Sequence, residues 1–548
     1  GGKMNKIVFI FLFIAANVTT AFSSVGLQWA SRYNGGGNSL DWSYAIAIDP
    51  VGDVVVTGYS TGAGTSKDYK TIKYNQAGAI LWEASFNGPI NGGDYSNALA
   101  IDALGNIYVT GRVDYGTSSD MVTIKYNSQG VQQWLARYMG PSNLSDEGKS
   151  IKVDGSGNVY VGGRTTSSVT GIDCITVKYN PDGSEAWVKT YFASGTNEDY
   201  IVSLDVDAAG NVYAGGCSVG ATTGQDLVVI KYNSEGDEEW VRRKNGAGNG
   251  GDALVSIKIS PEGSIVAAGY VYNSPEQGHN TYTIKYDVNG STIWQQEYNG
   301  LGSKTDFATA MTTDNNNNIY VTGLTTQIIN SRPDSNYATL KYDPSGQLLW
   351  VATYDGPSNS VDISRTIFVD NAANVYISGS SKGVGSDDYA TIKYNTSGAI
   401  QWIMSYNGTG NSNDYSSSVV ADAQGNAYVT GRSMGSSTDF DYATLKYGEI
   451  VGVNPVSGII PDKFGLYQNY PNPFNPATTI KFEIPEKSGV ILSMYNSAGM
   501  EVFQKDFGDL QPSVYEYSFT GIDLPSGVYF YRLNAGSFVS TKKMILVK

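Results

Sequence analysis

Residues 125–134 read Lys-Tyr-Asn-Ser-Gln-Gly-Val-Gln-Gln-Trp, and the same pattern returns through most of the chain. Its shared positions are Lys-Tyr, then Asn or Asp, a Gly three residues later and a Trp four residues after the Gly. The lysines that begin the copies are 52 to 56 residues apart: Lys73, Lys125, Lys178, Lys231, Lys285, Lys341, Lys393 and Lys446. An even period of this length is typical of a repeat architecture.

A second pattern lies inside each period and marks another tight turn. One copy comprises Asp102, Gly105, Asn106, Tyr108 and Gly111. In both patterns the Asp or Asn side chain opens the turn and Gly accepts the positive φ that closes it, so we interpret them as Asx turns rather than calcium loops. Four short strands can then be read in the first unit, at 44–48, 54–58, 69–74 and 79–85. Tandem four-stranded units predict the blades of a β-propeller.

The two ends of the repeat region are complementary. The last copy, at Lys446-Tyr447, stops without a Trp, whereas an isolated Trp copy, Leu27–Asn34, stands near the start of the chain. Trp29 is in phase with Trp82, and pairing the first strand with the last unit removes an exposed sheet edge. The sequence therefore predicts an all-β fold, an eight-bladed β-propeller over 25–448 closed by an N-terminal strand and followed by a small Ig-like β-sandwich.

The repeat resembles the bacterial β-propeller repeat family known as SBBP. The resemblance rests on strings such as Gly105-Asn106-Ile107-Tyr108-Val109-Thr110-Gly111 and Thr71-Ile72-Lys73-Tyr74-Asn75, and it covers about residues 25–449. It implies the fold and no particular activity, because propellers host many functions.

The remaining parts of the chain have a different composition. Residues 1–24 combine Met4-Asn5-Lys6, an apolar run over 7–16 and the small residues Thr19-Thr20-Ala21, the layout of a secretory signal peptide. Residues 449–462 contain Pro455, Gly458 and Pro461 and are predicted to be a linker. Residues 463–548 carry six runs of strand-like sequence, which predict the sandwich.

The tail resembles the C-terminal sorting domain of the type IX secretion system of Bacteroidetes-like bacteria. The matching positions are Tyr470, Pro471, Asn472, Pro473, Phe474, Asn475, Pro476, Gly527, Tyr529, Lys543 and Lys548. The resemblance implies that the type IX machinery is a partner and that the protein is secreted or held on the outer cell surface. In that family the tail is usually cleaved. An ordinary Ig-like accessory domain is the alternative.

Composition excludes several function classes. The chain has 36 Lys+Arg against 51 Asp+Glu, for a net charge of −15, without basic tracts, so nucleic acid is not a predicted partner. The single histidine, His279, excludes a multi-histidine metal site, and we predict no metal, no cofactor and no transmembrane segment in the mature chain. Cys174 and Cys217 are expected to be unpaired, although a disulfide between them stays open.

Ligand binding is predicted on the face that carries the variable loops. The loops Tyr270–Asn280 and Leu324–Asn336 are the long ones, and His279 in the first is expected to be solvated. An Asp precedes each first strand and predicts a ring near the axis, either binding a cation or polyhydroxyl ligand or bonding the backbone of adjoining loops. Aromatic residues beside the ring suit sugar stacking or packing. The candidate ligand-binding residues are Asp41, Asp94, Asp146, Asp199, Asp252, Asp306, Asp362, Asp414, Trp42, Tyr95, Tyr200, Phe307 and Tyr415.

Three functions are compatible with this sequence. The favoured one is an exported binding or adhesion protein that binds glycan or protein on the variable face, with no catalytic residue assigned. A secreted polysaccharide hydrolase or lyase would use acidic residues on that face, with Asp334 and Asp387 as candidates. A purely structural scaffold or adhesin is the third.

Overall fold

The structure is a computed structural model, and it describes residues 25–547 except 194–196, 301, 303, 330–331, 384, 450–453, 458–459, 476 and 522–523. The predicted signal peptide, Pro476 and Lys548 lie outside the described residues. The chain divides into two compact units, Leu27–Gly448 and the part from Glu449 onward. The described residues form strands and turns and contain no α-helix.

The strands of the first unit form eight antiparallel sheets among the described residues. The first four sheets are β2 (Trp42–Ile48), β3 (Val54–Thr61), β4 (Lys67–Tyr74) and β5 (Ile80–Phe86); β6 (Tyr95–Ile101), β7 (Ile107–Asp114), β8 (Ser119–Tyr126) and β9 (Gln132–Tyr138); β10 (Glu147–Val153), β11 (Val159–Ser167), β12 (Gly171–Tyr179) and β13 (Glu185–Tyr191), with β14 (Asn197–Glu198) beside β12; and β15 (Tyr200–Val206), β16 (Val212–Val219), β17 (Gln225–Tyr232) and β18 (Glu238–Lys244).

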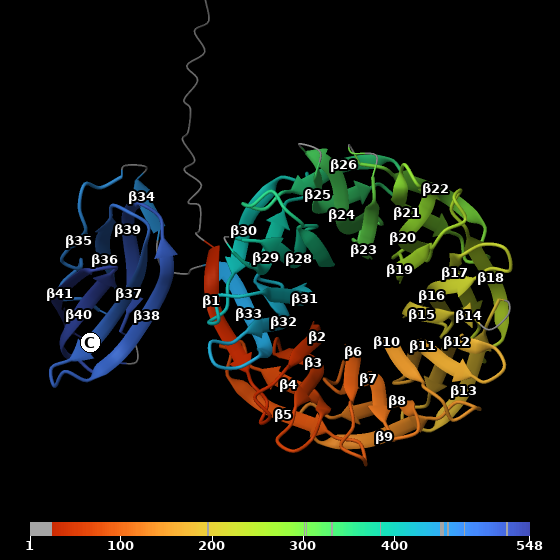
Figure 1. Cartoon of the computed structure of the whole chain (residues 1–548). Helices are drawn as coiled ribbons and strands as arrows, with labels where there is room; N and C mark the ends of the chain where they lie inside the picture. Colours follow the sequence, from red (N-terminus) through yellow and green to blue (C-terminus); the bar gives the residue numbers. More distant parts are fainter. Residues whose placement is uncertain are drawn as a thin grey trace, which may run out of the picture. The chain divides into compact units, whose positions relative to one another are not determined.

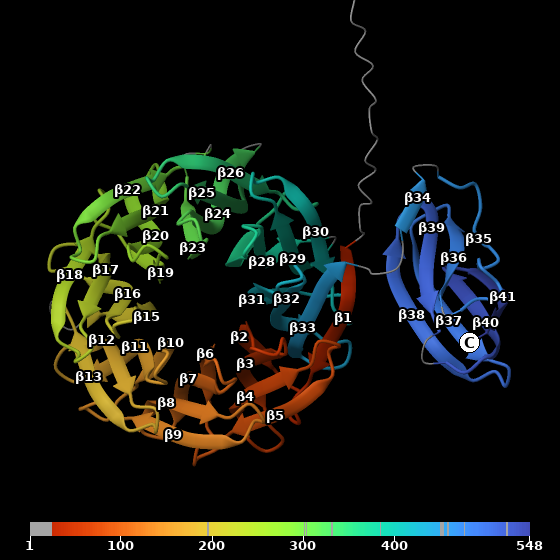
Figure 2. The ribbon, with the colours of Figure 1, turned by 180° about the vertical axis from the view of Figure 1, so that it is seen from behind.

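The other four sheets have the same strand order. They are β19 (Ala253–Ile259), β20 (Ile265–Ser274), β21 (Gly278–Tyr286) and β22 (Thr292–Tyr298); β23 (Asp306–Thr313), β24 (Ile319–Ile329), β25 (Arg332–Tyr342) and β26 (Leu348–Tyr354); β27 (Ile363–Val369), β28 (Val375–Lys382), β29 (Asp387–Tyr394) and β30 (Ile400–Tyr406); and β31 (Asp414–Ala421), β32 (Ala427–Met434) and β33 (Phe440–Glu449) with β1 (Val25–Tyr33). The sheets stand around an axis, with their first strands innermost and their fourth strands outermost (Figures 1 and 2).

Strand position explains strand composition. The middle strands are buried on both faces, as in β3 with its run Val-Val-Val-Thr-Gly-Tyr, and therefore read as nearly continuous apolar and Thr sequence. The outer strand β5 alternates between more and less exposed residues, which fits its Ile-Leu-Trp-Glu-Ala-Ser sequence. Each first strand carries a bulge, for example between Ser43 and Ala45, which bends it beside the axis.

The repeated Trp joins neighbouring sheets. Trp82 lies on β5 and donates its indole N–H to the carbonyl oxygen of Ser128, 3.0 Å away in the turn between β8 and β9 of the next sheet. The centroid of its ring lies 6.3 Å from that of Tyr126. Six further tryptophans, from Trp29 to Trp350, make the equivalent hydrogen bond. The Trp is thus a contact between sheets, as its recurrence in every repeat suggests.

The first described strand completes the last sheet. β1 pairs with β33, so the sheet runs β1-β33-β32-β31 and contains strands from both ends of the unit (Figure 1). The Nη2 atom of Arg32 lies 2.9 Å from Oδ2 of Asp441 and also donates to the carbonyl oxygen of Ser433. Trp29 reaches Gln76 in the adjoining sheet. The N-terminal strand therefore makes the same Trp contact with its neighbouring sheet as the fourth strands of the other sheets do.

The two long connections differ from the sequence-based prediction. Most of Tyr270–Asn280 and Leu324–Asn336 belongs to hairpin arms, because β20 and β21 pair as far as Ser274 and Gly278, and β24 and β25 pair as far as Ile329 and Arg332. Alternating side chains let these segments extend the ladders. His279 consequently lies on strand β21, paired with Tyr272, and not in a solvated loop.

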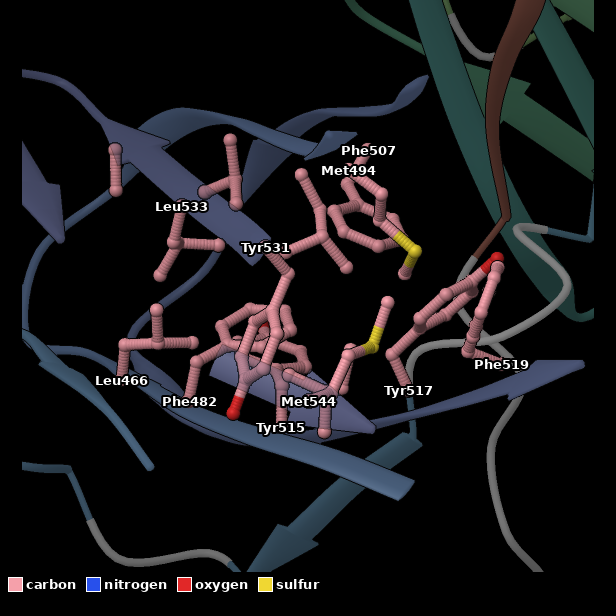
Figure 3. Close-up of a cluster of buried hydrophobic side chains, with 14 of the residues drawn as sticks. Leu466, Phe482, Met494, Phe507, Tyr515, Tyr517, Phe519, Tyr531, Leu533 and Met544 are labelled. Atoms are coloured by element: carbon pink, nitrogen blue, oxygen red, sulfur yellow. The ribbon is translucent and has the colours of Figure 1, made fainter. Parts of the chain in front are cut away.

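The second unit is a sandwich of two four-stranded sheets. One comprises β34 (Asn454–Ser457), β39 (Ser513–Thr520), β36 (Ala477–Ile484) and β35 (Gly465–Leu466); the other comprises β38 (Glu501–Leu510), β37 (Ser488–Asn496), β40 (Gly527–Ala535) and β41 (Phe538–Leu546). Phe482, Met494, Tyr531 and Leu533 are buried in the core between the sheets (Figure 3). The segment predicted to be a linker contains β34, and Pro455 fits there because β34 is an edge strand.

Candidate functional site

The ring of aspartates is used to hold loops in place. All eight are 2% exposed or less. In Asp41, Oδ2 accepts the N–H of Gly35 at 2.6 Å and Oδ1 accepts the N–H of Thr61 at 2.8 Å. The bridge to an N–H six residues back recurs at the other seven aspartates: Asp94, Asp146, Asp199, Asp252, Asp306, Asp362 and Asp414. The forward bridge comes from an N–H 20 residues on at Asp94, Asp199, Asp252, Asp362 and Asp414. At Asp146 and Asp306 a threonine hydroxyl 19 residues on donates the forward bond, from Thr165 and Thr325.

This geometry favours the backbone-bonding interpretation of the ring. Each carboxylate connects the loop that enters its sheet to the end of the second strand, and buried backbone N–H groups need such acceptors. Burial raises the pKa of Asp94 to about 6 and also raises the pKa of Asp41, despite the N–H donors that each accepts. Because the carboxylates are covered, we assign no ligand contact to them.

The axial mouth is the part of the ring where the sequence predicted aromatic residues. We define it as eight cross-strand pairs at the start of each first strand and the end of each second strand: Trp42–Tyr59, Tyr95–Arg112, Glu147–Arg164, Tyr200–Cys217, Ala253–Tyr270, Phe307–Leu324, Ile363–Ser380 and Tyr415–Arg432. The five predicted aromatic residues, Trp42, Tyr95, Tyr200, Phe307 and Tyr415, all belong to it and are partly exposed. Unlike the aspartates, they keep surface in contact with solvent.

Arg432 is at the centre of one aromatic group. Its guanidinium carbon lies 3.7 Å from the ring centroid of Trp42, 4.8 Å from that of Tyr415 and 4.6 Å from that of Phe440. Stacking of this kind stabilises a cation without neutralising its charge. Trp42 is itself fixed by a 2.8 Å hydrogen bond from Nε1 to Oγ of Ser417. The Nε atom of Arg432 is buried and has no hydrogen-bond partner in the structure.

The other group borders a cavity of about 420 Å³, which we call the axial pocket. It is lined by Val255, Tyr270, Phe307, Ala308, Thr309, Leu324 and Arg365, from β19, β20, β23, β24 and β27. The rings of Tyr270 and Phe307 meet edge to face at 4.4 Å, and His279 packs on Phe307 at 4.8 Å. Burial lowers the pKa of His279. A pocket of this size with aromatic walls and a few polar groups is suited to a small molecule or one segment of a chain.

Sequence reasoning missed the arginines of the axial mouth. Arg112, Arg164 and Arg432 each follow the Gly that ends the second pattern of their repeat, at Gly111, Gly163 and Gly431. Aligning the repeats at that Gly would have shown that the residue after it is Arg in three repeats and varies in the others. Arg365 is the third residue of β27 and does not follow such a Gly, so the sequence gives no comparable signal for it.

The two carboxylates considered for hydrolysis accept hydrogen bonds from neighbouring side chains, Asp334 within its own hairpin and Asp387 from the next sheet. Asp334 is 3% exposed, and its Oδ2 accepts weak hydrogen bonds from Gln327 and Asn336. Asp387 accepts a 3.1 Å hydrogen bond from the hydroxyl of Tyr415. Within the part of the chain that the structure describes, no three His, Cys, Asp or Glu side chains are placed to hold a metal ion.

The motif at the start of the tail packs against its last strand. Phe474 is 2% exposed, and its N–H donates to Ile545 at 2.9 Å, while Oδ1 of Asn472 accepts the N–H of Ile545. Tyr529 is also buried, with its hydroxyl on the carbonyl oxygen of Pro525. Tyr470, Pro471, Pro473, Asn475 and Lys543 are exposed, and Gly527 pairs with Leu546 on β41. The exposed members are available to a partner.

Two family models match the two units. The model described as a β-propeller repeat matches residues 133–169 and 294–330, and the model described as a secretion system C-terminal sorting domain matches residues 468–548. The chain therefore contains β-propeller repeats of the SBBP type and a C-terminal sorting domain of the type IX secretion system. The SBBP propeller carries the axial mouth, and the sorting domain indicates export to the cell surface or the medium. No helix formed by the described residues is long and apolar enough to cross a membrane.

The curated proteins that this chain matches are distant relatives. An uncharacterized WD repeat-containing protein, L264, of Acanthamoeba polyphaga mimivirus is 24% identical over 370 residues, which is 47% of this chain and 26% of the relative. The regulatory protein FlaEY of Caulobacter vibrioides is 26% identical over 147 residues, or 24% of this chain and 15% of the relative. The chain thus spans at most about a quarter of either relative.

Solved structures that are similar to this chain share little sequence with it. A periplasmic gluconolactonase of Pseudomonas aeruginosa, PpgL, has a TM-score of 0.41 at 14% identity, covering 66% of this chain and 95% of that one. An ulvan lyase of family PL25 has a TM-score of 0.37 at 11% identity, covering 76% of this chain and 95% of that one.

Proposed function

We propose that the protein is an exported binding protein whose axial mouth holds a glycan or protein ligand outside the cell. The sorting domain supplies the route, since it indicates engagement with the type IX secretion system. The propeller supplies a rigid ring that holds the ligand-facing side chains at fixed positions.

The observation that carries this proposal is the axial pocket. Most of its lining is apolar or aromatic, while Thr309 and Arg365 supply polar groups. Partly exposed aromatic faces next to fixed polar groups are the usual composition of a binding site. Phe307 was predicted from the sequence for this role, and Tyr270 and His279 complete its aromatic surroundings.

A hydrolase or lyase has less support. A general acid needs a carboxyl group with a raised pKa within reach of substrate. Among the aspartates of the ring, Asp94 has a pKa raised to about 6, but its oxygens accept the N–H groups of Gly88 and Asp114 and it is fully buried. The raised pKa at this position reflects the structural role of the ring.

The test combines location with binding. Mass spectrometry of the medium and of the cell surface should find the protein outside the cell, and deletion of residues 468–548 should retain it inside the envelope. The full chain and its Phe307→Ala variant are then compared on arrays of glycans and in capture experiments with surface proteins. Loss of a bound ligand in the variant supports the proposal. Retention of every ligand would instead favour a scaffold that binds elsewhere, and turnover of a polysaccharide would favour the hydrolase.

A further inference from the structure

The protein is acidic as a whole, but its innermost strands are not. The net charge of the chain is −15. Apart from the buried aspartate ring, the innermost strands carry two carboxylates, Glu147 and Asp205, and four cations, Lys149, Lys152, Lys258 and Arg365, all among the described residues. A basic surface in an acidic protein is a local feature that favours anionic ligands.

The two carboxylates are already paired. Oε2 of Glu147 lies 2.9 Å from Arg164 and 3.2 Å from Lys149, and Asp205 lies 3.2 Å from Lys152. No carboxylate of the described residues forms an ion pair with Lys258 or Arg365. The charge of Lys152 lowers the pKa of Lys258 to about 8, which shows how the cations repel one another beside the axis.

Arg365 is the one cation among the residues that line the axial pocket. Arg365 is exposed and lines the pocket from β27, while Arg432 is on β32 of the neighbouring sheet. Burial lowers the pKa of Arg432, and the charge of Arg365 is near enough to lower it further. Neither guanidinium has an ion-pair partner among the described residues, and Nε of Arg432 has no hydrogen-bond acceptor. An exposed guanidinium that lines a pocket and has no ion-pair partner can form paired hydrogen bonds with a bound anion.

The surroundings of Arg365 indicate what carries the anion. Phe307 and Tyr270 line the same pocket as Arg365, and an aromatic ring together with a guanidinium matches a sugar ring that bears an acidic group. The volume of about 420 Å³ is that of a small-ligand site, whereas a protein partner would have to bury roughly 800 Å² of each surface. A saccharide therefore fits this pocket better than an acidic protein does.

We propose that the axial pocket binds an acidic saccharide, with its carboxylate or sulfate group on Arg365 and a sugar ring against Phe307. This inference rests on the proposed binding function and names the class of ligand. Arginine forms paired hydrogen bonds with both kinds of anion, so the geometry assigns the shared chemistry and the experiment separates carboxylate from sulfate.

The experiment measures affinity by calorimetry with the full chain and three matched oligosaccharides. The probes are an oligogalacturonate, a sulfated oligogalactan and the uncharged oligogalactan, with an oligoglutamate peptide as the protein-like acid. We expect one of the acidic sugars to bind at least about tenfold more tightly than the neutral one, and Arg365→Gln to remove that advantage. The affinity should also fall as the salt concentration rises.

Lys244→Gln is the matched control. Lys244 also lies over an aromatic ring, 5.3 Å from Tyr282, but it is on the outer strand β18. This variant should bind as the unchanged protein does. A second measurement needs no ligand: because Arg365 is exposed and has no ion-pair partner among the described residues, Arg365→Gln should leave the melting temperature of the free protein unchanged. A lower melting temperature, with Lys244→Gln unaffected, would show that Arg365 is engaged within the protein and would contradict the inference.

The outcomes separate the two proposals. Equal binding of the neutral sugar, or tighter binding of the peptide, overturns the acidic-saccharide inference and leaves a binding function in place. Binding of an acidic sugar that Arg365→Gln leaves unchanged places the ligand elsewhere and also overturns it. If neither these probes nor the glycan and protein arrays reveal a ligand affected by Phe307→Ala, the binding function itself is wrong.

Discussion

The indole ring of Trp82 covers Gly130, a turn residue of the neighbouring sheet. A Cβ atom added to Gly130 would lie 2.6 Å from Cδ2 of Trp82, and Gly130 has a φ of +80°. The Gly in the repeated pattern is therefore required twice, once by its own turn and once by the Trp of the preceding repeat. The same relation joins Trp29 to Gly78, which brings the N-terminal strand into the contact scheme of the ring.

Gly130→Ala should destabilise the protein more than an equally strained substitution elsewhere. We expect it to lower the free energy of unfolding by about 2–4 kcal/mol, since it adds a steric clash to an unfavourable backbone conformation. Gly263→Ala is the control, because Gly263 has a φ of +88° but no atom within 4 Å of the added Cβ. Denaturant unfolding gives both values, and equal losses would mean that Trp82 moves aside.

Arg32 should contribute to closing the ring. Its side chain is 19% exposed and that of its ion-pair partner Asp441 is 7% exposed, so removing the arginine leaves a largely buried carboxylate without its cation. Arg32→Gln is expected to lower the free energy of unfolding by about 2 kcal/mol. A double-mutant cycle with Asp441→Asn isolates the pair, and a coupling energy near zero would contradict its role.

Deletion of Leu27–Asn34 should have a larger effect, because it removes most of β1 and exposes the edge of β33. The melting temperature should fall sharply, and calorimetry measures the change. The double mutant of Arg32 and Asp441 is a useful reference, since it keeps the strand. A deletion variant that melts no lower than that reference would show that β1 is dispensable.

Asp94 should make the propeller less stable as the pH rises. Its pKa is raised from 3.8 to about 6 in the folded protein, so the folded state binds more protons than the unfolded state in that window. The contribution of Asp94 to the free energy of unfolding is complete below its unfolded pKa of 3.8 and is lost as the pH rises through its folded pKa of about 6. Unfolding measured between these two pH values should show a shallower decline for Asp94→Asn than for the unchanged protein. Parallel curves would refute the shift.

The two cysteines should be inert in the folded protein. Both are free and buried, and the Sγ of Cys174 lies 3.8 Å from the carbonyl oxygen of Cys217. Burial raises the pKa of Cys217 to about 11 and also raises that of Cys174, which keeps both as unreactive thiols. A thiol reagent should label neither residue in buffer and both in guanidinium chloride. Fast labelling of the native protein would show that the sheets open locally.

The sequence predicted the strands well where local chemistry defines them. The Asx turn at Asp102 is an example: its Oδ1 accepts the N–H groups of Leu104 and Asn106, so the turn is encoded within five residues. The hairpin arms around His279 were missed because a strand that extends beyond its usual length has no distinct local signal. Whether such a segment pairs depends on its partner strand across the turn.

The sequence by itself determined the four-stranded repeat, the separate tail and the sorting motif, because turns, alternation and short motifs act over a few residues. Tertiary structure alone decided which side chains remain available to a ligand. It buried the aspartate ring against backbone N–H groups and brought Tyr270, Phe307 and Arg365, from three different repeats, into one pocket. The physical reason is that burial and charge neighbours depend on how successive sheets pack around the axis, and no single repeat contains that information.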